Sequence, residues 1–146
     1  MSARRFASED EIEAVGRGLI ACDYPPKRFD HAAHWAAVLW LLRQAPEIDA
    51  VRDMPGFIRR FNVAAGGANT DTDGYHETIT QASIRAAAHA LAEAPAGAPL
   101  HEVCNGLLET AFGKSDWILH YWSRERLFSV EARRRWIEPD LNPLPW

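Results

Sequence analysis

Hydrophobic positions recur with helical spacing along most of the chain. The pair Ser8 and Glu11 is typical of a capping box, and an apolar stripe follows at helical spacing, formed by Ile12, Val15, Leu19 and Ile20. We therefore predict a first helix over residues 8–22. Asp30 is the expected N-cap of a second helix that runs to Gln44. That segment is apolar nearly all round, which is typical of a helix in the middle of a bundle.

The rest of the chain also favours helices. A third helix is expected from Pro46 and Glu47, with a break or kink at Pro55-Gly56. After a polar loop at 66–74, a fourth helix opens at 75–78, with Asp73 or Thr72 as its N-cap, and runs to about residue 93. A linker at 94–99 precedes a fifth helix over 100–112, then short helices near 115–121, 124–128 and 130–136, and a proline-rich tail. There is no useful strand alternation and no internal repeat. The pattern predicts an all-α fold, a single-domain helical bundle of four to five main helices with an irregular C-terminal wrap.

Composition narrows the function classes. With 146 residues and 47% hydrophobic residues, the chain suits one domain over 1–146 with its own core. A net charge of -4 argues against nucleic-acid binding through a basic face, so we interpret the arginines of the last quarter as a solvated surface. Cys22 and Cys104 are isolated, and the longest apolar stretch, 32–42, is too short to span a bilayer. We expect a cytoplasmic protein that binds neither a membrane nor nucleic acid.

Three histidines are the main candidates for chemistry. His31 and His34 are three residues apart and share one face of the second helix, while His76 heads a similar inward stripe on the fourth. If the helices alternate up and down, the second and fourth run parallel and their N-termini lie at the same end. The three imidazoles are then expected to converge.

Three interpretations of this cluster remain open. The first is a Zn, Fe, Mn or Ni site on His31, His34 and His76, with Glu77 or Asp116 as carboxylate ligand or general base. The second is a metal-free ligand or catalytic site in which helix N-termini and histidines bind a carboxylate or phosphate. The third is a structural network in which the histidines bond to carbonyls or threonines. The candidate substrate contacts are Tyr75, Thr78, Thr80 and His120, the last oriented by Asp116 four residues earlier.

Other motifs are weaker. Asn69, Asp71, Asp73 and Gly74 match the start of a calcium loop, but its final glutamate position is Thr80, so we expect no high-affinity calcium site. No nucleophile elbow, P-loop or dinucleotide motif is present, and Cys22 is interpreted as a small residue that closes the first helix. Two tryptophans, Trp35 and Trp40, are expected in the core. The other four are expected to seal the C-terminal part onto the helices: Trp117, Trp122, Trp136 and Trp146. The alternative for these four is an aromatic pocket or a homodimer surface.

The chain also resembles a family of short bacterial all-α proteins. The residues that carry the resemblance are FDHAAHWAAVLWLL at 29–42, GYHETIT at 74–80 and LFSVEARRRWIEPDLNPLP at 127–145. The shared pattern is F-x-H-x-x-H, Y-H-E-T-x-T and an E-P-D-L tail. The resemblance implies that His31, His34, His76, Glu77, Thr78 and Thr80 act as one unit, and it implies no particular reaction.

The leading functional hypothesis is a histidine and carboxylate pocket that binds a divalent metal and acts on a small molecule by hydrolysis or isomerisation. The alternative is a non-enzymatic binding or interaction module whose histidines form a structural polar network.

Overall fold

The computed structural model describes residues 4–146, and these residues contain seven α-helices and no strand. The five longer helices form the body of the protein, and two short ones follow in the C-terminal part: α1 (Glu9–Ala21), α2 (His31–Leu42), α3 (Ala50–Ala64), α4 (Glu77–Glu93), α5 (Leu100–Leu108), α6 (Arg124–Leu127) and α7 (Val130–Arg134). Short 3₁₀ helices lie between them, including η2 (Ala111–Gly113) and η3 (Trp117–His120). The predicted all-α single-domain fold is confirmed.

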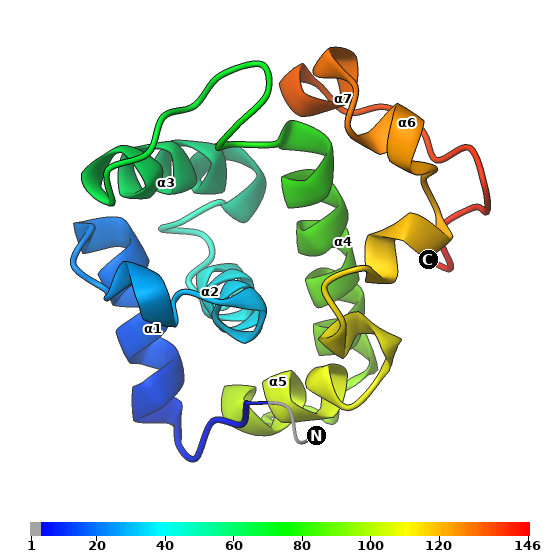
Figure 1. Cartoon of the computed structure of the whole chain (residues 1–146). Helices are drawn as coiled ribbons and strands as arrows, with labels where there is room; N and C mark the ends of the chain where they lie inside the picture. Colours follow the sequence, from blue (N-terminus) through cyan, green and yellow to red (C-terminus); the bar gives the residue numbers. More distant parts are fainter. Residues whose placement is uncertain (1–3) are drawn as a thin grey trace.

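The central helix is α2. Figure 1 looks along its axis, with α1, α3, α4 and α5 arranged around it, and α2 contacts all four. Trp35, Leu39 and Leu41 are almost completely buried, as expected for a helix that is apolar on every side. The four surrounding helices each turn one apolar face toward it. The core is therefore organised around a single buried helix.

Local capping starts most of the longer helices. Ser8 accepts a hydrogen bond from the Glu11 N–H, and Asp30 accepts one from the Ala33 N–H, as predicted. Cys22 ends α1 in the left-handed conformation, with φ of 59°. These caps satisfy backbone groups that a helix cannot pair internally.

Three expectations about the helices are wrong. α3 does not break at Pro55, because the proline removes only one internal hydrogen bond while Met54 and Ile58 are buried on either side of it. The fifth helix ends at Leu108, and a separate 3₁₀ turn follows. Finally, α4 runs across the axis of α2 and not parallel to it (Figure 1), so the simple up-and-down arrangement does not hold.

The C-terminal part wraps over the N-terminal half of α4. Its anchor is Trp122, whose ring is completely buried and whose Nε1–H donates to the Ile137 carbonyl at 3.1 Å. Figure 1 shows α6 and α7 beside the start of α4. Trp35 and Trp40 are buried, as expected for core residues, and the burial of Trp117 and Trp122 agrees with their expected role in sealing the C-terminal part onto the helices.

None of the helices in residues 4–146 has both the length and the apolar character needed to cross a membrane.

Candidate functional site

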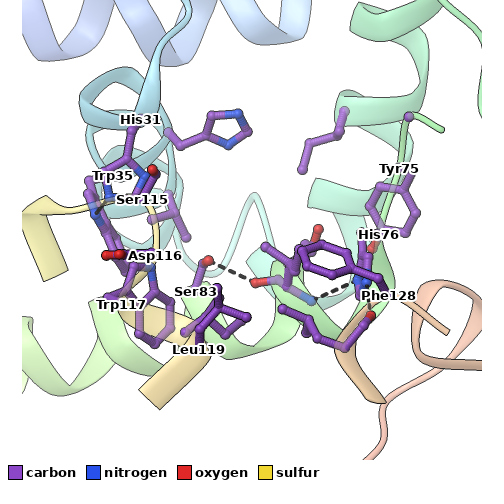
Figure 2. Close-up of a pocket in the computed structure, with 18 of the residues that line it drawn as sticks. His31, Trp35, Tyr75, His76, Ser83, Ser115, Asp116, Trp117, Leu119 and Phe128 are labelled. Carbon is purple, nitrogen blue, oxygen red and sulfur yellow. Dashed lines mark hydrogen bonds between the residues drawn. The ribbon is translucent and has the colours of Figure 1, made fainter. Parts of the chain in front are cut away.

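A cavity of about 640 Å³ opens between α2, α3, α4, η3 and α6, and we call it the main pocket. This volume lies within the range of small-molecule sites. Figure 2 shows His31, Trp35 and Trp117 on one side of it and Tyr75, His76 and Phe128 on the opposite side. All three predicted histidines line the main pocket. They lie there although α2 and α4 cross, because the loop before α4 and the first turn of α2 reach the same cavity.

His34 is the most available polar group in the main pocket. Its ring packs edge-on against Phe29, with 4.7 Å between ring centroids, and neither ring nitrogen has a hydrogen-bond partner within residues 4–146. Protein surrounds the ring, while its exposed surface faces the pocket, which water can enter. This enclosure, reinforced by the neighbouring His31, lowers the pKa of His34 to about 4. At neutral pH the ring is uncharged, with one donor and one acceptor nitrogen.

One ring nitrogen of His31 is hydrogen-bonded within residues 4–146, and the other is not. Its Nε2 lies 2.8 Å from the Phe112 carbonyl oxygen, which also accepts the Trp35 Nε1–H at 2.9 Å. A carbonyl cannot donate, so Nε2 carries a proton in this contact and cannot also accept the Trp35 Nε1–H, which lies 3.2 Å from it. In this neutral tautomer Nδ1 is an acceptor. In the described part of the chain this Nδ1 has no hydrogen-bond donor. His31 therefore presents a fixed acceptor beside His34.

His76 is a structural residue. It is the N-cap of α4, where its Nδ1 accepts the Ile79 N–H at 3.1 Å, and its Nε2–H donates to the Leu127 carbonyl at 2.7 Å. Burial lowers its pKa, so the ring stays neutral and keeps this tautomer. Asp73 and Thr72 were the expected caps, and that prediction is wrong. Both ring nitrogens of His76 are occupied by these hydrogen bonds, so neither is free to coordinate a metal ion as predicted.

Thr78 is also structural. It is completely buried, and its hydroxyl lies 2.7 Å from the Ala132 carbonyl and 2.9 Å from the Arg135 carbonyl. Its oxygen also accepts the Ile137 N–H at 3.3 Å. These contacts join α4 to the C-terminal wrap, and Thr78 does not line the main pocket. The expectation that it contacts a substrate is not supported by this position.

Tyr75 and Thr80 do line the main pocket, whereas Glu77 does not. The Tyr75 hydroxyl donates to the Glu77 carboxylate, which also accepts from Gln81 at 3.3 Å. Burial and this carboxylate raise the pKa of the Tyr75 hydroxyl. Glu77 therefore holds the Tyr75 hydroxyl in place. It does not line the cavity, where it was expected as a general base or a metal ligand.

The rim of the main pocket carries charge. Asp116 and Arg124 both line it, are exposed, and make no ion pair with another residue of the described chain. His120 is exposed on η3, packs its ring against Tyr121 and does not line the pocket. Asp116 therefore agrees with its predicted place near the histidines, and His120 does not.

The side chains expected to coordinate a metal ion do not come together as a set of ligands. Within residues 4–146 no three histidine, cysteine, aspartate or glutamate side chains lie together in a way that could hold a metal ion. His31 and His76 are on opposite sides of the main pocket (Figure 2). In the loop at 66–74, Asp71 pairs with Arg134, and Asn69 accepts the Tyr75 N–H at 3.0 Å, so these calcium-loop residues have protein partners.

Several residues of the main pocket were not predicted from the sequence, among them Asn62, Ser83 and Arg124. Ser83 had a visible signal, because it lies three residues after Thr80 and so shares its helix face. Asn62 and Arg124 had none, since each reaches the cavity only through the packing of α3 and α6.

Comparisons of the chain with models of protein families, with curated proteins and with solved structures found no match.

Proposed function

We propose that the main pocket binds a small organic molecule that has an aromatic or apolar body and at least one polar hydrogen. The observation that carries this proposal is the neutral imidazole of His34, which faces the cavity without a protein partner. His34 is exposed to the cavity, so its two ring nitrogens are open to a ligand that enters. A small number of such polar groups usually fixes the orientation of a ligand in a pocket.

The surrounding side chains support the same class of ligand. Phe128 provides an exposed aromatic ring, the buried Trp35 and Trp117 line the apolar wall, and Thr80 and Ser83 add hydroxyl groups from α4. Aromatic rings bind flat ligands by stacking or edge contacts, while a few polar groups fix their orientation. The free Nδ1 of His31 offers a second acceptor next to His34.

Binding is better supported than general-base catalysis. A general base works best when its pKa is near the working pH, and the pKa of His34 is lowered to about 4. Such a ring is a weak proton acceptor but a good neutral hydrogen-bonding group. Asp116 at the rim is the remaining candidate for moving a proton, and it has no partner that orients it toward the cavity.

Phenol and anisole test the proposal, because both fit the cavity and only phenol has a polar hydrogen. We expect phenol to shift the NMR signals of the Trp35 and Trp117 side chains saturably, with a Kd of about 1 mM, and anisole to bind more weakly. His34→Leu removes the acceptor and keeps an apolar side chain. It should weaken phenol binding by about fivefold or more, since one hydrogen bond is worth about 1 kcal/mol.

His120→Leu is the matched control, because His120 is exposed and outside the pocket. It should bind phenol like the unchanged protein. If neither probe gives saturable shifts, the cavity does not accept small molecules. If His34→Leu binds phenol as tightly as His120→Leu does, His34 is not the recognition group.

A further inference from the structure

A second, smaller cavity lies on α3, the loop at 66–74 and α7. Its volume is about 210 Å³, and three arginines line it: Arg59, Arg133 and Arg134. Tyr75 lines both this cavity and the main pocket. The single carboxylate that lines the small cavity is Asp71.

The charges in this cavity are not balanced. Asp71 is engaged by Arg134, whose Nε and Nη2 lie 2.8 and 2.6 Å from its two oxygens. Arg59 and Arg133 have no carboxylate within 4.0 Å in the described part of the chain. The lining therefore carries three guanidinium groups and one carboxylate, and among the described residues neither Arg59 nor Arg133 has an ion pair of its own.

Arg133 has an unused donor. Its Nη1–H groups donate to the carbonyls of Gly74 and Tyr75, at 3.0 and 3.3 Å, which fixes the side chain against the loop. Its Nε is buried and has no hydrogen-bond partner within residues 4–146. A buried, charged donor without a partner is unfavourable unless a ligand or water completes it.

Arg59 is held in place by an aromatic ring. Its guanidinium carbon lies 4.4 Å from the centre of the Tyr75 ring, a cation–π contact. The Arg59 side chain donates no hydrogen bond to another residue of the described chain, so its N–H groups are available. The fork of donors on an arginine matches the oxygens of a phosphate or carboxylate.

We propose that this small cavity binds a phosphate group. Two unpaired arginines match an anion with two negative charges, whereas a single carboxylate needs one arginine, as Asp71 and Arg134 already show. The site is separate from the main pocket and does not depend on the phenol experiment. The phosphate belongs either to inorganic phosphate or to an organic phosphate ester, and the test separates these sources.

The test titrates inorganic phosphate, phenyl phosphate and acetate against the full chain at constant ionic strength, with backbone NMR signals of 69–75 as the readout. We expect saturable shifts with both phosphates and at least about tenfold weaker binding of acetate. Tighter binding of phenyl phosphate identifies an ester as the ligand. Tighter binding of inorganic phosphate identifies the free anion.

Arg59→Gln and Arg60→Gln form a matched pair, because both residues are exposed on α3 and both stack on an aromatic ring, but only Arg59 lines the cavity. Arg59→Gln should weaken phosphate binding by about tenfold, and Arg60→Gln by less than about twofold. Equal effects of the two variants, equal binding of acetate, or no saturable shift with either phosphate would overturn the proposal. Thermal unfolding of both variants checks that the fold is retained.

Discussion

The Nε2–H of His76 donates to the carbonyl oxygen of Leu127 across 51 residues of sequence, at 2.7 Å. The same ring caps α4 through Nδ1, so one imidazole joins the start of α4 to the end of α6. The contact is buried, and each nitrogen has a single defined role. This arrangement explains how a histidine at the edge of the main pocket serves the fold.

His76→Ala should lower the free energy of unfolding by about 2–3 kcal/mol. The cap contributes about 1 kcal/mol, and the buried Leu127 carbonyl left without a donor costs about 1–2 kcal/mol. Asparagine is a good N-cap, so His76→Asn should lose only about half as much. Urea unfolding followed by circular dichroism measures both. A loss below about 0.5 kcal/mol for His76→Ala, or equal losses for the two variants, would contradict the dual role.

The local parts of the fold were predictable from sequence, and His76 shows where prediction failed. Ser8 and Asp30 cap helices through contacts three residues away, so their roles are visible in short patterns. Histidine is not a usual cap, and Leu127 lies too far along the chain for any periodic pattern to pair it with His76. His31 and His34 were expected to point inward at the head of a buried stripe. Both line the main pocket, but His34 is exposed there and not buried. Their free and occupied nitrogens depend on Phe112 and on the crossing of α2 and α4, which spacing does not encode.

Thr78 and Thr80 are two residues apart and should respond differently to replacement by valine. Thr78→Val removes the hydroxyl that contacts the Ala132 and Arg135 carbonyls and the Ile137 N–H, so we expect a loss of about 2–3 kcal/mol in stability. Thr80→Val changes a pocket-lining group and should cost less than about 1 kcal/mol while altering phenol binding. Chemical unfolding and the phenol titration measure the two effects. Similar stability losses in both variants would contradict a structural role for Thr78 and a pocket-lining role for Thr80.

His34 should make stability depend on pH. Its pKa is about 4 in the folded protein and about 6.5 in an unfolded chain, so the unfolded state binds more protons between these values. The stabilisation associated with neutral His34 is therefore complete above about pH 6.5 and is lost as the pH falls toward 4. His34→Gln cannot take up a proton and should flatten this part of the curve. The free energy of unfolding at several pH values, together with an NMR titration of the His34 ring, checks the prediction. A ring that titrates near 6.5 would refute it.

Gly16 and Gly106 are both helical, but alanine should have opposite effects at the two positions. A Cβ on Gly16 would lie 2.3 Å from Cε3 and 2.5 Å from Cδ2 of Trp40, so α1 and α2 could not keep their present approach. A contact this close belongs at the upper end of the cost of overpacking, about 2–3 kcal/mol, and outweighs the gain in helix propensity of about 1 kcal/mol.

Gly106 is exposed on α5, and a Cβ there would meet nothing within 4 Å. Gly106→Ala should therefore stabilise the protein by about 0.4–1 kcal/mol, because alanine restricts the unfolded chain without a clash. Gly16→Ala should destabilise it by about 1–2 kcal/mol, since α1 must move away from the Trp40 ring. The urea midpoint measures both changes. If alanine stabilises both positions, the close contact between Gly16 and Trp40 does not limit the packing of α1 on the central helix.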